Sequence, residues 1–248
     1  MLEFEKDPIQ NQTAEKLRHL GIEAIVFDLD DTLIYTSEIF RRFMAEYTEI
    51  VSVLLNMDYG TLNERLKKIN DEEYFKTGVS PDRWRVVLDR LSQELNGNEI
   101  VVNHIDILMK IYTEEPRVRA GAKAILSGLR DAGFKLGMVT HANTDWTIRK
   151  LTQTGLINYF DAIEIANENG FKTIEHWQKG ISLLNVKNNQ CLVVGDNLKG
   201  DIIPSVSLGA KAIWMPSPWS VYREGEVPTG VIQMKELTDF WDAVQELN

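Results

Sequence analysis

The chain has 248 residues, 44% of them hydrophobic, which is enough for a sizeable core in one large domain or two small ones. Its formal net charge of -10 at pH 7 disfavours broad, nonspecific attraction to nucleic acid or to an anionic membrane, although one local cation is enough to hold an anionic substrate. Because Cys191 is the single cysteine, no internal disulfide can form, and a reducing compartment is expected.

The N-terminal segment, Met-Leu-Glu-Phe-Glu-Lys-Asp-Pro, is charged and lacks the apolar core of a signal peptide. The sequence contains no run of 18 apolar residues that could span a membrane. We therefore expect a cytoplasmic protein that binds neither membranes nor nucleic acid. No pattern in the sequence indicates its oligomeric state.

The chain opens with a short predicted helix and a buried strand. Residues 12–20 have helical character up to Gly21, and Glu-Ala-Ile-Val-Phe at 23–27 is an apolar strand. This strand leads directly into the acidic turn Asp28-Leu29-Asp30-Asp31-Thr32.

From Ser37 to about Tyr112 the apolar residues follow a helical period. The apolar positions of the first helix are Ile39, Phe40, Phe43, Met44, Tyr47, Ile50, Val51, Leu54 and Leu55. Further helices are predicted at 59–69, 81–96 and 99–112. Ser80 and Pro81 fit the N-cap and N1 positions of a helix. No strand is expected here, so this segment is predicted to be an all-helical insert.

After the insert, predicted strands and helices alternate regularly. Helices are expected at 121–131, 144–153, 174–185, 199–208 and 236–246. Strands are expected at 134–139, 161–165, 191–194, 211–214 and 231–233. This alternation predicts an α/β fold in which a Rossmann-like parallel sheet carries helices on both faces.

Three polar residues lie just past the ends of predicted strands. Asp28 follows the first strand, Thr140 follows the strand at 134–139, and Asp196 follows the strand at 191–194. Parallel sheets place their chemistry at the carboxyl ends of the strands. We therefore expect these three side chains to lie at the same edge of the sheet.

The acidic turn after the first strand is the first candidate site. It places Asp28, Asp30 and Asp31 within four positions, and these carboxylates repel one another unless a cation binds among them. Taken alone, the turn is also consistent with a polar loop that caps the next turn of the chain.

A second acidic motif, Gly195-Asp196-Asn197, follows a later buried strand, and Asp201 comes five residues after Asp196. By itself this pattern is also consistent with a turn and a helix N-terminus, where aspartate is favourable.

Two weaker signals lie between these motifs. Thr140, His141 and Asn143 stand at a predicted helix N-terminus, a natural place for an anion, although a threonine there is usually only a cap. Lys172, in Gly170-Phe171-Lys172, precedes another helix, although a single lysine is usually solvated.

The order and spacing of the four motifs together resemble the haloacid dehalogenase superfamily. The chain has Asp-x-Asp-x-Thr after a first strand, Thr after a second, Lys before a helix, and Gly-Asp-x-x-x-x-Asp after a later strand. The resemblance covers about residues 22–240. It implies a core catalytic domain of residues 1–36 and 113–248, with 37–112 as a helical cap domain.

Two positions depart from the pattern of that family. Lys172 is followed by Thr173 where the family commonly has proline, and Thr140 is followed by His141 where it commonly has asparagine. Neither departure removes a reacting group.

The balance of charge points to a metal ion independently of the resemblance. Four candidate site residues, Asp28, Asp30, Asp196 and Asp201, bring up to four negative charges, whereas Lys172 returns one positive charge. Oxygen ligands favour a hard cation, and a site shared with phosphate and water favours Mg²⁺ over Ca²⁺.

The resemblance implies a role for each candidate. Asp28 would be the nucleophile that forms an aspartyl-phosphate, and Asp30 the general acid and base. Mg²⁺ would be held by Asp28, Asp196 and the backbone carbonyl of Asp30, with Asp201 acting through water or a neighbour. The phosphoryl group would be bound by Thr140, His141 and Lys172. Dehalogenating members of the superfamily lack the second aspartate, so Asp30 favours phosphate chemistry.

The expected function is therefore Mg²⁺-dependent hydrolysis of a phosphate monoester of a small metabolite. Two alternatives remain open, a phosphotransferase or mutase of the same family and a non-catalytic module that binds phosphate esters. A cap would choose the leaving group, but each candidate contact is also consistent with an ordinary surface residue. Those candidates are Arg41, Arg42, Arg83, Trp84 and Arg85.

Overall fold

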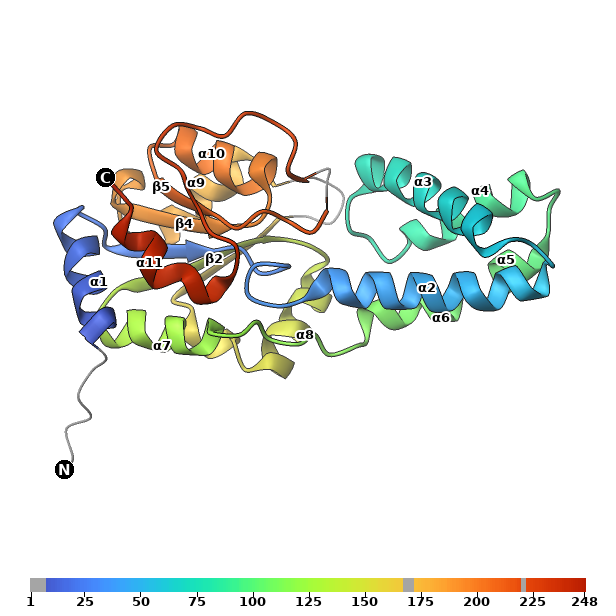
Figure 1. Cartoon of the computed structure of the whole chain (residues 1–248), viewed down its shortest axis with the longest axis horizontal. Helices are drawn as coiled ribbons and strands as arrows, with labels where there is room; N and C mark the ends of the chain where they lie inside the picture. The colour runs from blue at the N-terminus through green and yellow to red at the C-terminus, as the bar shows by residue number, and fades with distance from the viewer. Residues whose placement is uncertain (1–7, 167–171, 220–221) are drawn as a thin grey trace, which may run out of the picture.

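The structure of the chain is a computed structural model that describes residues 8–166, 172–219 and 222–248. It is an α/β fold in which a long helical insert extends from one edge of a sheet (Figure 1). Within the described residues, no helix is both long and apolar enough to cross a membrane.

The sheet has six strands in the order β3-β2-β1-β4-β5-β6, and every adjacent pair is parallel. The strands are β1 (Ala24–Phe27), β2 (Lys135–His141), β3 (Ala162–Ala166), β4 (Cys191–Gly195), β5 (Lys211–Trp214) and β6 (Ile232–Gln233). The chain builds outward from β1 to β3 and then returns to place β4 on the other side of β1. Such a change of direction opens a crevice at the carboxyl ends of the strands, where ligands bind.

Helices cover both faces of the sheet, as the alternation of the sequence predicts. The core helices are α1 (Pro8–His19), α7 (Ala122–Asp131), α8 (Thr144–Thr154), α9 (Ile174–Leu183), α10 (Ile203–Ser207) and α11 (Phe240–Gln245). In β1, Ile25 and Phe27 pack in the same apolar cluster as α1, α7 and α11, whereas Ala24 and Val26 pack against α9. The period of two along a strand therefore divides the core into two layers.

Several boundaries differ from the sequence-based prediction. The strand predicted at 134–139 continues through His141, because Thr140 and His141 still pair with β3. The helix predicted at 199–208 is divided into a π-helix, η4 (Leu198–Ile202), and α10, and the last helix is divided into the 3-10 turn η6 (Leu237–Asp239) and α11. The 3-10 turns η2 (Ile157–Tyr159) and η3 (Asn188–Gln190) precede β3 and β4.

The insert, residues 36–112, is helical, as its apolar period predicts. It contains α2 (Thr36–Leu54), α3 (Tyr59–Thr77), α4 (Arg83–Glu94), α5 (Glu99–Asn103), α6 (Ile105–Met109) and the 3-10 turn η1 (Lys110–Tyr112). The prediction for α4 was wrong at its start, because Asp82 is the N-cap and Ser80-Pro81 form the preceding turn. The helix predicted at 99–112 is interrupted at His104, whose backbone is not helical.

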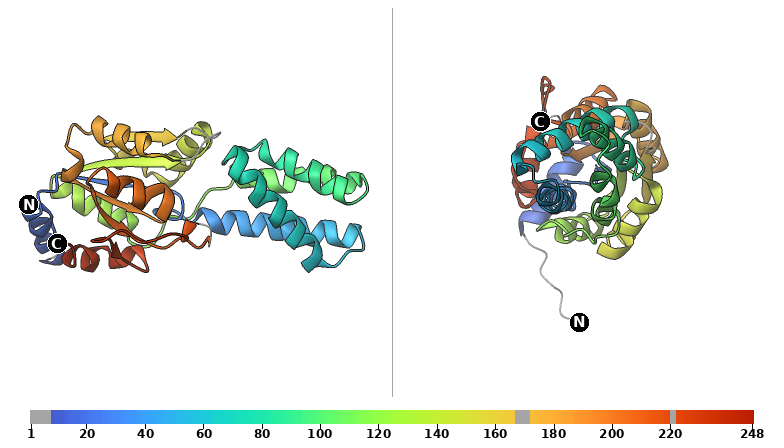
Figure 2. Two further views of the ribbon diagram at one scale, coloured as in Figure 1. Left: turned by 90° about the horizontal axis from the view of Figure 1, so that it is seen from above. Right: turned by 90° about the vertical axis from the view of Figure 1, so that its right-hand side faces the viewer.

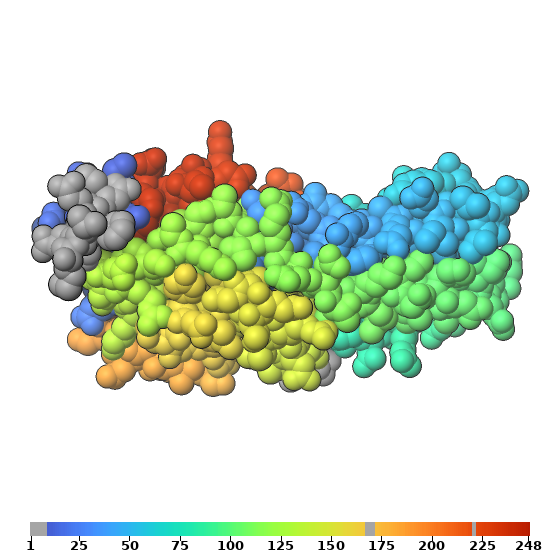
Figure 3. All heavy atoms as spheres, turned by 90° about the horizontal axis from the view of Figure 1, so that it is seen from below, coloured from blue at the N-terminus to red at the C-terminus, as the bar shows by residue number. Residues whose placement is uncertain are grey.

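The insert has an apolar core of its own and lies beyond one end of the sheet (Figure 2). In the space-filling view, α2 and the segment from α5 to η1 lie side by side (Figure 3). Two linkers join it to the sheet, and they are paired to each other. The backbone N–H of Tyr35 donates to the carbonyl of Arg117 at 2.9 Å, and that of Arg119 donates to the carbonyl of Leu33 at 2.9 Å.

We expect Gly180→Ala to destabilise the protein, although alanine is the better helix former. Gly180 is the point where α9 packs on β2, and a Cβ there would lie 2.3 Å from Cγ2 of Val139. To make room for the methyl group, α9 or Val139 must shift from its packed position. This shift should lower the free energy of unfolding, measured by urea titration, by about 1–3 kcal/mol.

Gly128→Ala in α7 is the matched control, because the nearest atom to its Cβ is the flexible side-chain amide of Gln10 at 3.0 Å. It should leave the stability unchanged or raise it by up to about 1 kcal/mol. Equal effects of the two substitutions would contradict the close packing of α9 on β2.

Candidate active site

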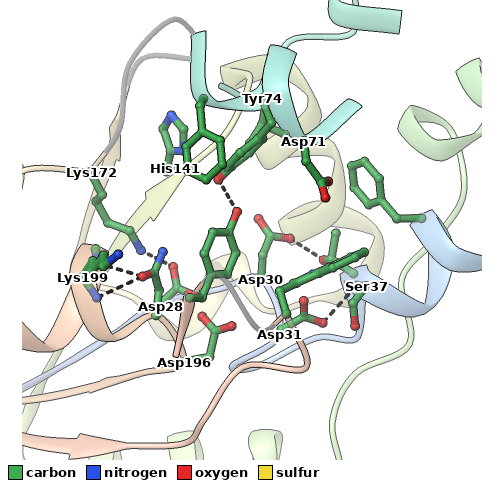
Figure 4. A pocket seen from close by; sticks show the side chains of 18 of the residues that line it. Asp28, Asp30, Asp31, Ser37, Asp71, Tyr74, His141, Lys172, Asp196 and Lys199 are labelled. Atoms are coloured by element: carbon green, nitrogen blue, oxygen red, sulfur yellow. Dashed lines mark hydrogen bonds and ion pairs between the residues drawn. The ribbon is translucent and has the colours of Figure 1, made fainter. Parts of the chain in front are cut away.

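The carboxyl ends of β1, β2 and β4 bring the predicted residues to one edge of the sheet (Figure 4). Asp28 follows β1 directly, and its backbone N–H donates to the carbonyl of Val194 in β4 at 2.9 Å. On the other side, Phe27 is paired with Met138 of β2, two residues before Thr140. The neighbouring strands therefore bring Asp28, Thr140 and Asp196 to the same edge, as expected.

Three buried carboxylates form a cluster at this edge. One oxygen from each of Asp28, Asp196 and Asp201 lies within 4.8 Å of the others. The three residues are between 0% and 4% exposed. Asp30 was also predicted as a metal residue, but its side chain does not belong to this cluster. Its backbone carbonyl is the atom that the resemblance assigns to the ion.

The local backbone explains how Asp201 reaches the cluster. The π-helix η4 turns Asp201 back towards β4, where its Oδ2 accepts a hydrogen bond from the backbone N–H of Asn197 at 3.0 Å. A Cβ on Gly195 would lie 2.5 Å from the same oxygen, so only glycine fits at the end of β4. Asp201 therefore lies within the cluster itself and does not stand behind it.

Lys172 is the cation of the cluster. Its Nζ forms ion pairs with Asp28 and, at 2.6 Å, with Oδ1 of Asp201, and it donates to the carbonyl of Val139 at 3.2 Å. Burial opposes the charge, but the carboxylates of Asp201 and Asp28 outweigh it and raise the pKa of Lys172 above its usual value. Gly170 and Phe171 of the same motif lie outside the described residues.

The cluster carries more negative charge than its surroundings compensate. Burial raises the pKa of Asp28 to about 7, opposed by Lys172 and reinforced by the carboxylates of Asp201 and Asp30. Burial, followed by the charges of Asp28 and Asp201, also raises the pKa of Asp196 well above its usual value. When all three acids are ionised, the positive charge of Lys172 cancels one of the three negative charges. The two that remain would be neutralised by one divalent cation. The donor set, three buried carboxylates, fits a hard divalent cation.

Asp30 has a different partner, which sequence reasoning missed. Lys150 of α8 donates from Nζ to both carboxylate oxygens of Asp30, at 2.7 Å to Oδ2, and Thr36 also donates to this carboxylate. The Lys150 side chain is 0% exposed, and its Nζ lies 3.8 Å from the centre of the Trp146 ring. The available signal was a lysine on the otherwise apolar face of a predicted helix.

Asp31, the third acid of the turn, contributes to the connection with the insert. Its backbone has a φ of 59°, and its Oδ1 accepts a hydrogen bond from the backbone N–H of Ser37 at 2.9 Å. Its own carbonyl accepts from Nε of Arg119 at 3.0 Å. Asp31 therefore fixes the start of α2 against the second linker.

The two candidate phosphate-binding residues of β2 differ in character. Thr140 is completely buried, and its Oγ1 has no hydrogen-bond partner among the described residues. His141 is half-buried and lines the adjacent pocket. Burial, followed by the charge of Lys172, lowers the pKa of His141 to about 4, so its ring is neutral at pH 7.

A pocket of about 380 Å³ lies between this edge and the insert, a volume typical of small-ligand sites. Asp28, Lys172 and Asp196 line one end. The insert and the segment after β5 supply much of the remaining wall, through Phe40, Met44, Asp71, Tyr74, Phe75, Val79, Arg83, Trp219 and Tyr222. The hydroxyl of Tyr222 donates to that of Tyr74, which joins the two walls across the pocket (Figure 4).

Only one of the five predicted cap contacts reaches this pocket. Arg83 lines it, whereas Trp84 is 0% exposed within the apolar core of the insert. The other three arginines, Arg41, Arg42 and Arg85, are exposed outside it.

The sequence matches the haloacid dehalogenase-like hydrolase family over residues 22–207. A glyceraldehyde 3-phosphate phosphatase from Pyrococcus furiosus is 28% identical over 225 residues, which cover 88% of this chain and 88% of that protein.

Solved structures share the fold. A haloacid dehalogenase-like family hydrolase from Xanthomonas campestris superposes with a TM-score of 0.72 at 17% identity, covering 91% of each chain. The HAD-hydrolase YfnB from Bacillus subtilis, whose structure contains magnesium, gives a TM-score of 0.65 at 17% identity and covers 90% of this chain and 99% of its own.

We expect the affinity of the cluster for Mg²⁺ to fall by at least about tenfold for each pH unit below pH 7. A cation requires the ionised form of Asp28, whose pKa is raised to about 7, and of Asp196, whose pKa is also raised, so protons compete with the ion as the pH falls. Calorimetric titrations between pH 5.5 and pH 8.5 would measure the dissociation constant and the protons released.

Asp196→Asn should weaken binding at every pH, because it removes one charged ligand. The control Asp89→Asn changes an exposed carboxylate of α4 outside the pocket and should leave binding unaltered. A dissociation constant independent of pH from 5.5 to 8.5 would contradict this description of the cluster.

Proposed function

The chain belongs to the haloacid dehalogenase-like hydrolases, and on this basis we propose that it is a Mg²⁺-dependent phosphatase that uses Asp28 to hydrolyse a phosphate monoester of a small metabolite. The observation that carries the proposal is the buried cluster of three carboxylates around Asp28, compensated by Lys172 alone among the described residues. A carboxylate can approach an anionic phosphate only where further positive charge is present, and a cluster of this kind can hold the cation that supplies it.

The relatives support phosphate chemistry on small molecules. The protein from Pyrococcus furiosus carries the name of a phosphatase of glyceraldehyde 3-phosphate, and its similarity extends over most of both chains. The magnesium bound to YfnB supports the choice of ion. The pocket volume of about 380 Å³ is also suited to a small phosphorylated metabolite.

The residues that would hold Mg²⁺ are Asp28, Asp196 and the backbone carbonyl of Asp30, with Asp201 close enough to bind directly or through water. When bound, the ion neutralises charge on the phosphoryl group and on the nucleophile. The ammonium group of Lys172 has three N–H donors, which are directed at Asp28, Asp201 and the carbonyl of Val139. Contact with a phosphoryl oxygen would take the place of the bond to the uncharged Val139 carbonyl and keep both ion pairs.

The chain's own groups would divide the reaction into two steps. A carboxylate oxygen of Asp28 attacks phosphorus while the bond from phosphorus to the leaving oxygen breaks, and Asp30 gives that oxygen a proton. Water then attacks the aspartyl-phosphate and loses a proton to Asp30, which releases phosphate and restores Asp28. Since Lys150 contacts both oxygens of Asp30, the carboxyl group must turn away from Lys150 to reach the leaving oxygen.

Two residues of β2 would complete the phosphate site. The unpartnered, buried Oγ1 of Thr140 is available to donate to a phosphoryl oxygen. His141 is neutral at pH 7, so it would contribute a ring N–H and not a positive charge.

We assign residues 37–112 to a cap domain and the rest of the chain to the catalytic core. The helical insert forms its own apolar cluster and covers the reactive edge. A cover of this kind excludes water from the reacting groups and selects the leaving group.

We expect Asp28→Asn to abolish phosphate release while the protein stays folded, because an amide is a poor nucleophile. The assay measures inorganic phosphate from a panel of phosphorylated metabolites in the presence of Mg²⁺, with circular dichroism as the test of folding. Phosphate released to water, and not passed to a second metabolite, distinguishes a hydrolase from a phosphotransferase. Turnover that survives in Asp28→Asn would refute the nucleophile assignment.

We expect Asp30→Ala to slow hydrolysis by about 10²–10⁴-fold for esters with poor leaving groups. Esters of nitrophenol should be affected much less, because their leaving oxygen needs no proton. Comparing kcat for the two kinds of ester separates proton donation from a general loss of structure. Equal losses for both would contradict the acid role of Asp30.

A further inference from the structure

Arg83 is a buried basic residue in the wall of the pocket that the insert provides. It is the first residue of α4 and is 3% exposed, and it lines the pocket together with Tyr74 and Val79. Nothing in the proposed chemical steps uses it.

The surroundings of Arg83 provide no ion-pair partner for its charge. Its Nη1 donates to the carbonyl of Gly78, and its guanidinium lies 5.3 Å from the Tyr74 ring centre and 5.5 Å from that of Trp84. Its Nε has no hydrogen-bond partner, and no carboxylate of the described segments lies within 4.0 Å of its nitrogens. Asp71 lines the same pocket, and the charge of Arg83 acts on its carboxylate, but the two residues form no ion pair.

The two lysines whose side chains are buried at the site differ from Arg83 in this respect. Lys150 is paired with Asp30, and Lys172 is paired with Asp28 and Asp201. Burying a charge is expensive unless a group of opposite charge accompanies it. A buried guanidinium that lines a ligand pocket without an ion-pair partner is therefore suited to an anion that arrives with the ligand.

We propose that Arg83 binds a second, non-reacting anionic group on the leaving group of the substrate. The substrate would then be a phosphate monoester whose alcohol part also carries a carboxylate or a second phosphate. This inference rests on the proposed phosphatase function, because it places the reacting phosphate at Asp28 and Lys172. The aromatic and apolar residues that line the pocket, including Phe40, Met44 and Trp219, would contact the carbon skeleton.

Matched pairs of substrates test the proposal. Glycerol 3-phosphate and 3-phosphoglycerate differ in a carboxylate, and glucose 6-phosphate and glucose 1,6-bisphosphate differ in a second phosphate. We expect the protein to prefer the member with the second anion in at least one pair. Arg83→Met should then lower kcat/KM for that member by about 30-fold or more, and for its partner by less than about threefold. The pair that responds identifies the anion as carboxylate or phosphate.

Two further variants keep the result interpretable. Arg83→Lys keeps the positive charge but loses the planar guanidinium, so it should retain part of the preference for the second anion. A variant that failed to fold would retain none of it. Arg85→Met removes the same charge from the exposed face of the same helix and should leave both members unchanged. Equal losses for both members in Arg83→Met, or a wild-type preference for the members without the second anion, would overturn the proposal.

Binding measurements separate this inference from the proposed function. The inactive variant Asp28→Asn and the double variant Asp28→Asn/Arg83→Met, both as full-length proteins, are titrated by calorimetry with both members of each substrate pair. A difference that depends on Arg83, without hydrolysis of any ester by the wild type, would refute the phosphatase and keep the anion site. Hydrolysis by the wild type without a difference that depends on Arg83 would refute the anion site and keep the phosphatase.

Discussion

The structure depends on three carboxylates that lie together, out of water, at the end of a parallel sheet. Asp28, Asp196 and Asp201 repel one another, and burial alone makes each charge costly. Lys172 relieves part of this repulsion, and the two negative charges that remain define what the site can bind. The glycine at 195 and the π-helix after it are consequences of the same requirement, because they bring the third acid close to the other two.

The helix after β2 links the reactive edge to the insert. Trp146 packs against Tyr112 with ring centres 4.9 Å apart and against Phe40 at 6.2 Å, so it belongs to the apolar core of the insert. One turn later, Lys150 lies against the same ring and holds the carboxylate of Asp30. A displacement of the insert would therefore be felt at Asp30 through contacts between neighbouring side chains, whereas Asp28 is fixed by the sheet.

The sequence was enough to predict the layers of the fold and the main groups of the site, because both follow from local patterns. Apolar strands that end in polar residues predict the shared edge where Asp28 and Asp196 lie. Lys150 and Arg83 were not identified in these roles, since whether a basic side chain is buried and what faces it depend on packing between distant segments. Gly195 is part of a motif that the sequence shows, but the reason that only glycine fits there is seen only in the structure, where Asp201 occupies the space of a Cβ.

The reacting groups and the groups that surround the leaving group come from different parts of the chain. The carboxylates and Lys172 lie at the ends of strands or directly before a helix of the core, where small movements would separate them. The far wall comes mainly from α3 and α4. The segment after β5 adds Trp219 and Tyr222 to this wall and also contacts the cluster, because the backbone N–H of Ser217 donates to the carbonyl of Asp196 at 3.1 Å. Since chemistry and selectivity are carried by separate elements, a shared fold and a shared nucleophile leave the substrate undetermined, and the charge at the far wall becomes the informative feature.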